Sequence, residues 1–124
     1  MDFKNTKAIY LQIADSICDS ILSGEYPEDG KLPSVREVAA DVEVNVNTVA
    51  RSFEWLQSQD VVVTKRGLGN FVNIGARAAV ERLRRREFFE EQLPEMFRTM
   101  VTLGISIEEI MENWEISRQS SAIQ

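Results

Sequence analysis

The chain has 124 residues, of which 44% are hydrophobic, and a formal net charge of −6. This length and composition suit one folded domain, or one small domain with an appendage. Histidine is absent and Cys18 is the single cysteine, which excludes the usual zinc sites and any Ser-His or Cys-His nucleophile pair. Carboxylate catalysis stays open because acids are plentiful, but they sit singly on polar faces and converge on no glycine-rich loop, so we expect no enzyme, no cofactor and no metal.

The same composition bears on where the protein works. One cysteine forms no intrachain disulfide, which favours a reducing, cytoplasmic setting. No apolar run approaches the ~20 residues that span a bilayer, so no membrane partner is expected.

Three helices are predicted in the first half of the chain. Apolar residues recur at helical spacing over residues 8–23, and Gly24 follows as a stop signal. Ser34, with Glu37 three residues later, makes a capping box that starts a second helix. Asn45 caps a third helix after a short turn. Two short helices separated by a tight turn are typical of a helix-turn-helix.

A β-hairpin is predicted after the third helix. The segments VVVTK, from Val61, and NFVNI, from Asn70, are rich in strand-forming residues. RGLG between them supplies two glycines for a hairpin tip that needs positive φ. The order of three helices and a hairpin predicts a mainly α, α+β fold: a winged helix-turn-helix with a two-stranded wing over residues 1–75.

Residues 76–124 are predicted to form a helical appendage for dimerisation. A long helix, kinked by Pro94 because proline lacks a backbone donor, precedes a last helix that Ser106 and Glu109 cap. The apolar residues at helical spacing are expected to face a second copy of the chain. They are Val80, Leu83, Phe89, Leu93, Phe97, Met100, Ile107, Ile110, Met111 and Trp114.

Polar side chains at the start of the third helix suit the major groove of DNA. Asn47 can pair bidentately with adenine, and Thr48 can reach a base edge or touch a thymine methyl. Arg51, one turn further on, can reach a phosphate or a guanine. The other DNA-binding candidates lie at helix starts and at the hairpin tip. They are Ser34, Arg36, Asn45, Lys65, Arg66, Gly67 and Gly69.

Each candidate also has a purely structural interpretation. Ser34 and Asn45 cap helices whether or not they touch DNA. Asn47 and Thr48 can be ordinary solvated residues, and the glycines can serve only the turn.

The acidic balance is the main objection to DNA binding. Residues 1–75 carry 7 Lys/Arg and 11 Asp/Glu, and residues 76–124 carry 7 and 9. Because phosphate neutralisation supplies most non-specific affinity, such a chain is expected to bind random DNA weakly. No acid lies between Asp60 and Glu81, where the wing falls, so the local field can still be positive there. A subunit that binds DNA weakly gains affinity when a dimer binds two half-sites at once. This favours a homodimer on an inverted repeat.

Three motifs in this order resemble the GntR family of bacterial transcription regulators: IYLQIADSICDSILSGEY, KLPSVREVAADVEVNVNTVARSFEWLQ and KRGLGNFV. The match covers about residues 8–74. The form NVNTVARSF and a tail of only about fifty residues resemble the short YtrA-like branch. In that branch two dimerising helices replace a large effector-binding domain. The resemblance implies a regulator, expected to be a repressor, that binds double-stranded operator DNA and commonly controls a transporter operon.

By position, the resemblance implies DNA contacts at Arg36, Asn47, Thr48, Arg51 and, in the wing tip, Gly67 and Gly69. Val46 and Ala50 stand where many family members carry arginine, so the base-reading set of those members does not transfer. Glu43 stands where the turn usually has glycine. A positive φ at that position costs on the order of 1 kcal/mol.

Two alternatives stay open from the sequence. A winged-helix module whose acidic surface binds protein and never DNA would have the same fold. A groove near Pro94, lined by Phe88, Phe89 and Phe97, can hold an effector, although such apolar residues usually pack as a dimer core. The sequence identifies no small-molecule effector.

Overall fold

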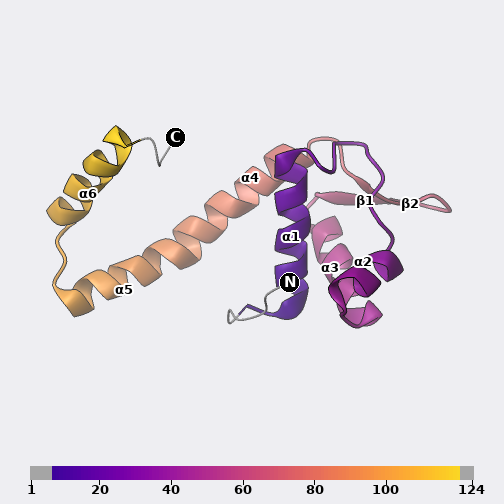
Figure 1. The fold of residues 1–124 in the computed structure, drawn as a ribbon, viewed down its shortest axis with the longest axis horizontal. Coiled ribbons are helices and arrows are strands. Elements are labelled where there is room, and N and C mark those ends of the chain that lie inside the picture. The colour runs from indigo at the N-terminus through magenta and orange to yellow at the C-terminus, as the bar shows by residue number, and fades with distance from the viewer. Residues whose placement is uncertain (1–6, 121–124) are drawn as a thin grey trace. The chain divides into compact units, whose positions relative to one another are not determined.

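The computed structural model describes residues 7–120 (Figure 1). The elements are α1 (Ile9–Ser23), α2 (Val35–Val42), α3 (Val46–Ser58), β1 (Val62–Lys65), β2 (Gly69–Val72), α4 (Ala76–Glu87), the π-helical turn η1 (Phe88–Gln92), α5 (Leu93–Leu103) and α6 (Ile107–Gln119). Three helices followed by an antiparallel strand pair confirm the predicted winged helix-turn-helix. Within the described part of the chain, no helix is both long and apolar enough to cross a bilayer.

The chain divides into two compact units, Met1–Arg84 and Arg85–Gln124. We call them the N-terminal unit and the C-terminal unit. The predicted boundary after residue 75 falls just before α4, whereas the N-terminal unit continues through most of that helix.

Helices α2 and α3 begin where the sequence places their caps. Ser34 Oγ accepts the Glu37 N–H at 3.1 Å, and the Glu37 carboxylate accepts the Ser34 N–H at 3.2 Å. These two bonds complete the predicted capping box. Asn45 Oδ1 accepts the Asn47 N–H at 2.7 Å and so caps α3. Between the helices, Glu43 has a φ of 56°, the left-handed geometry that a glycine would adopt more easily.

The wing is a two-stranded antiparallel hairpin. Strand β1 begins one residue after the predicted Val61, and β2 one residue before the predicted Asn70. Gly67 and Gly69 have φ values of 77° and 111°, so the tip does need residues that tolerate positive φ. The loop between α1 and α2 runs beside the hairpin, where Lys31 and Phe71 form an isolated antiparallel bridge and the Leu32 N–H donates to the Asn70 carbonyl at 2.9 Å.

The core of the N-terminal unit lies between α1, α3, the base of the wing and the start of α4. It includes Ile13, Ile17, Ile21, Val49, Phe53, Leu56, Val61, Val72, Ala76 and Val80. Ser52 is the polar exception on α3: it is fully buried, and its hydroxyl donates to the Tyr10 carbonyl at 2.7 Å. That bond ties α3 to α1 across the core.

Helix α4 starts inside this core. Ala76 and Val80 are 0% exposed and Leu83 is 5% exposed. The prediction that Val80 and Leu83 face a second subunit is therefore corrected, because both pack within their own chain. Arg84 of the same helix forms an ion pair with Asp19 of α1, with Nη2 2.8 Å from Oδ1.

The C-terminal unit holds the end of α4 with η1, α5 and α6. The predicted long helix is interrupted at η1, where the Leu93 N–H reaches back to the Phe88 carbonyl in a π-type bond. Pro94 follows at once, and its missing N–H would otherwise bond a carbonyl of that turn. Ser106 and Glu109 form the second predicted capping box, at the start of α6.

None of the described residues 85–120 is buried. Instead, α5 and α6 expose a series of large apolar side chains: Met96, Phe97, Val101, Leu103, Ile107, Met111, Trp114 and Ile116. We call these eight residues the C-terminal apolar surface. A single copy of the chain therefore leaves this unit without a core.

Candidate nucleic-acid interface

The first turns of α3 divide their side chains between core and solvent. Val49 and Phe53 are buried, whereas Asn47 and Arg51 are exposed and Thr48 is half-buried. This division follows from helical spacing, which places residues three and four apart on one face. The three predicted base-reading residues thus share the solvent side of the helix start.

Arg51 is held in place by an aromatic ring on α1. Its guanidinium carbon lies 4.0 Å from the centre of the Tyr10 ring, a cation–π contact. The Tyr10 carbonyl accepts the Ser52 hydroxyl, so ring and arginine are fixed to the same core. A groove of about 360 Å³ runs beside the contact, with Asn47 and Thr48 in its wall. Arg51 is therefore positioned without any help from DNA.

The start of α2 presents Ser34 and Arg36 to solvent. The first N–H groups of a helix lack intrahelical partners and attract phosphates. Here the Glu37 carboxylate also occupies this end, and its hydrogen bonds to the Ser34 backbone and side chain lower its pKa. Glu37 is thus an ionised group beside the expected phosphate, and Arg36 supplies the opposing charge.

The two basic residues of the wing differ. Lys65 Nζ pairs with Asp29 Oδ1 at 3.0 Å and stands 4.3 Å from the centre of the Phe71 ring. Much of its charge is therefore balanced within the unit. Arg66 is exposed and forms no ion pair with another residue in the range 7–120. Arg66 is the stronger candidate for a phosphate contact.

The glycines of the wing tip have different surroundings. A Cβ on Gly67 would meet nothing within 4 Å, so its φ of 77° is the reason for glycine there. A Cβ on Gly69 would come within 3.3 Å of Lys31 Cε. Lys31 is an exposed cation that the sequence analysis did not select. Lys31 is the first residue of the motif KLPSVREV, three residues before the capping box, and that position was the signal that could have found it.

A chain of side-chain hydrogen bonds joins the end of α3 to the wing. Gln57 Nε2 donates to Thr64 Oγ1 at 2.5 Å, and Thr64 Oγ1 donates to Asn70 Oδ1 at 2.7 Å. The wing is thus braced against the helix that presents Arg51. The predicted DNA-binding residues all lie in the N-terminal unit, at three places: the α2 start, the α3 start and the wing.

Two details of the α3 start bear on its candidate residues. Asn45 Oδ1 already accepts the Asn47 N–H, so its cap role is observed and its DNA role stays a prediction. Val46 is 38% exposed at the first position of the helix. An apolar side chain there can contact a thymine methyl, a role that polar-residue reasoning does not detect.

The geometry is that of a winged-helix DNA-binding domain, and comparison with known proteins gives the family. The family model "Bacterial regulatory proteins, gntR family" matches residues 9–72. The chain belongs to the GntR family and is a transcriptional regulator whose domain of this type binds DNA. This confirms the family resemblance of the three sequence motifs.

Relatives of similar length extend the match beyond the winged helix. The chain is 36% identical over 110 residues to an uncharacterized HTH-type transcriptional regulator, YhcF, from Bacillus subtilis, covering 89% of each chain. It is 28% identical over 112 residues to the HTH-type transcriptional repressor YtrA from the same organism, covering 90% of this chain and 85% of YtrA. A crystal structure of a GntR-family regulator from Bacteroides thetaiotaomicron aligns with a TM-score of 0.77 and 52% identity, over 91% of this chain and 100% of that one.

Proposed function

We propose that this protein is a transcriptional repressor that binds an inverted-repeat operator as a homodimer. The observation that carries the proposal is the solvent face of α3. There Asn47 and Thr48 line the same groove as Arg51, whose guanidinium carbon lies 4.0 Å from the centre of the Tyr10 ring. Side chains of these types read adenine, thymine and guanine edges in the major groove.

The homodimer is proposed from the C-terminal apolar surface. Among the predicted dimerisation residues, Phe89, Phe97, Ile107, Met111 and Trp114 are between 48% and 61% exposed. Leu93, Met100 and Ile110 are half-buried. Monomeric proteins rarely leave so many large apolar side chains in water. A second copy of the same surface would cover them in a symmetric, self-complementary contact.

Two subunits would also double the number of cations that contact DNA, which would offset the acidic balance of the chain. The cations predicted to contact phosphate are few: Arg36, Arg51 and Arg66 in each subunit. Lys31 is exposed but lies outside this predicted set, and Lys65 is paired to Asp29. If a dimer neutralises about six phosphates, the logarithm of its DNA affinity falls with the logarithm of salt concentration with a slope of roughly −5. A monomer would show about half that slope and little affinity.

Repression is proposed because the relative YtrA of B. subtilis is named a repressor. A dimer bound across a promoter would exclude RNA polymerase by occupancy alone. The first operator to test is the DNA upstream of the protein's own gene, and the family resemblance suggests a transporter operon as its target.

The decisive experiment is a fluorescence-anisotropy titration with that upstream DNA at several salt concentrations. We expect Arg51→Ala to weaken specific binding at least tenfold, since a bidentate arginine–guanine contact contributes about 1–3 kcal/mol. Arg118→Ala is the matched control: Arg118 is an exposed arginine of α6, outside the proposed interface, and its loss is expected to leave DNA affinity unchanged.

Two outcomes would contradict the proposal. Wild-type protein that binds the upstream DNA no better than random DNA at every salt concentration would favour the protein-binding module instead. Sedimentation equilibrium that shows only monomer at micromolar concentration would remove the homodimer.

A further inference from the structure

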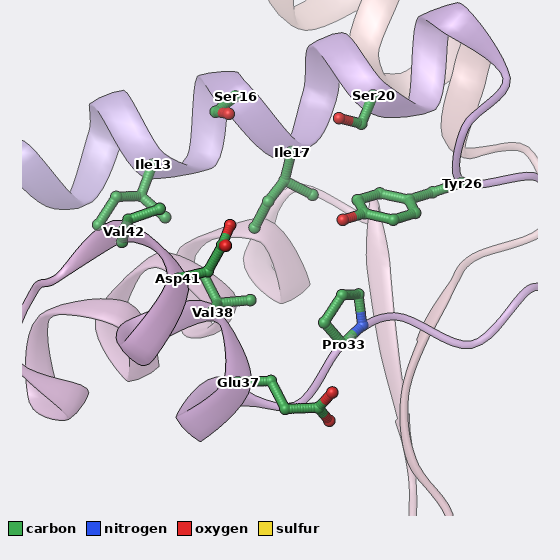
Figure 2. A pocket seen from close by; sticks show the side chains of 10 residues that line it. All are labelled: Ile13, Ser16, Ile17, Ser20, Tyr26, Pro33, Glu37, Val38, Asp41 and Val42. Carbon is green, nitrogen blue, oxygen red and sulfur yellow. The ribbon is translucent and has the colours of Figure 1, made fainter. Parts of the chain in front are cut away.

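A cavity of about 300 Å³ lies between α1, α2 and the loop that joins them (Figure 2). Its apolar floor comes from both helices: Ile13 and Ile17 of α1, and Val38 and Val42 of α2. Ile13 and Ile17 are 1% and 6% exposed, so this wall is part of the core of the N-terminal unit. The volume is at the small end of the range for ligand pockets.

The polar groups around this floor are hydrogen-bond acceptors or hydroxyls. Ser16 and Ser20 line the α1 side, Tyr26 and Pro33 come from the loop, and Glu37 and Asp41 come from α2. Figure 2 shows the Asp41 carboxylate directed toward α1 and the Tyr26 hydroxyl turned into the same space. None of the residues that line the cavity is a lysine or an arginine.

The charge of the cavity is negative. The pKa of Tyr26 is raised first by burial and then by the nearby carboxylates of Glu25 and Asp41. The pKa of Glu37 is lowered by its bonds to Ser34, so that carboxylate stays ionised. Asp41 forms no ion pair with another residue between 7 and 120, which leaves its charge available to a ligand.

We propose that this cavity binds a small alkylammonium compound. Its hydrocarbon part would lie on Ile17 and Val38, and its ammonium group would donate to the Asp41 carboxylate and the Tyr26 hydroxyl. An anion would be repelled by the carboxylates of Glu37 and Asp41, because no lysine or arginine lines the cavity. A purely apolar ligand would strip water from the hydroxyls and carboxylates without replacing their hydrogen bonds.

Such a ligand would act close to the nucleic-acid interface. Glu37 lines the cavity and also caps the start of α2, through its bonds to Ser34. An ammonium group held at Asp41 would add one positive charge beside the helix that Glu37 caps, and would so partly offset the acid that competes with a DNA phosphate at the start of α2. This regulatory consequence rests on the proposed function, whereas binding of the amine itself does not.

Binding is tested on the full chain without DNA, by following backbone amide shifts in ¹H–¹⁵N NMR spectra. The probe is 1-butylamine hydrochloride at constant ionic strength, with 1-butanol as the neutral match and sodium butyrate as the anionic one. We expect saturable shifts at Ser16, Tyr26 and Asp41 with butylammonium, and at least tenfold weaker binding of the other two compounds.

Two variants test whether butylammonium binds in this cavity and at Asp41. Asp41→Asn should weaken butylammonium binding at least tenfold, while Glu54→Gln, which removes an exposed acid of α3 outside the cavity, should leave it unchanged. Ser16→Leu fills the cavity from a half-buried position and should abolish the shifts while the rest of the spectrum stays folded. Equal binding of butanol, or unchanged binding by Asp41→Asn, would overturn the proposal.

The regulatory link is measured separately, as DNA affinity with and without saturating butylammonium. A change that Asp41→Asn abolishes supports the link. Saturable amine binding with no change in DNA affinity would overturn the link and keep the site, and absence of any DNA binding would count against the proposed function alone.

Discussion

The two units of this chain contain the same local helix signals but differ in how far their helices are buried. Each contains a Ser–Glu capping box, at Ser34 in the N-terminal unit and at Ser106 in the C-terminal unit. The helices of the N-terminal unit then bury a shared core, whereas no described residue from 85 to 120 is buried. Local capping starts a helix, but tertiary packing supplies most of its stability. The N-terminal unit is thus self-contained, whereas the described residues of the C-terminal unit form no core of their own.

The largest test of this difference compares two phenylalanines. Phe53 is 2% exposed in the N-terminal unit and Phe97 is 48% exposed in the C-terminal unit. Phe53→Ala should lower the free energy of unfolding by about 3–5 kcal/mol, because it leaves a cavity. Phe97→Ala should lower it by less than ~1 kcal/mol in dilute protein and should instead weaken dimerisation. Urea denaturation and sedimentation velocity measure the two effects. Equal losses in dilute protein would show that the C-terminal unit is packed within one chain.

The two capping boxes give a second, smaller test. Ser34→Ala should lower the free energy of unfolding by about 1 kcal/mol at any protein concentration, because its partner bonds belong to the self-contained unit. Ser106→Ala should act mainly on the dimer dissociation constant. Thermal melts at two widely separated protein concentrations distinguish these behaviours. A concentration-independent loss from Ser106→Ala would argue that α6 is stable without a partner.

The contact between Arg51 and Tyr10 tests whether operator binding depends on the N-terminal unit without any change in dimerisation. Tyr10→Leu removes the ring beneath Arg51 and should weaken operator binding by about threefold, since an exposed cation–π contact contributes about 0.5–1 kcal/mol. The dimer dissociation constant should not change. Tyr10→Phe keeps the ring and should bind DNA like the wild type. A Phe variant as weak as the Leu variant would assign the effect to the hydroxyl instead.

The smallest expected effect is a gain in stability. Glu43→Gly relieves the left-handed backbone at φ 56°, and the extra entropy of glycine in the unfolded chain offsets part of this. We expect a net stabilisation of about 0.5 kcal/mol, seen as a higher melting temperature. Asp60, at φ 62°, is the control, because aspartate tolerates this region better and Asp60→Gly should gain less. A lower melting temperature for Glu43→Gly would count against the turn geometry.

Features governed by neighbouring residues could be predicted from the sequence. The Ser34–Glu37 box, the Asn45 cap and the positive φ of Gly67 each depend on residues a few positions away, and all are observed. The strained Glu43 was likewise expected from the family pattern.

Features that depend on residues far apart in the sequence could not be predicted from it. The Lys65–Asp29 ion pair and the Tyr10 ring beneath Arg51 join parts of the chain that only the fold brings together. Helical spacing identified Val80 as apolar but could not say whether its partner lay in the same chain or another. The roles of the candidate side chains toward DNA remain predictions for the same reason: they depend on a molecule outside the chain.

The division of α3 into two faces has an evolutionary consequence. Val49, Ser52 and Phe53 anchor the helix, while Asn47 and Arg51 project away from it. Under the proposed function, substitutions on the outer face would change which operator is bound at little cost to folding. A small number of codon changes along this single helix would then redirect the proposed repressor to another operator, provided that the buried residues of the inner face are kept.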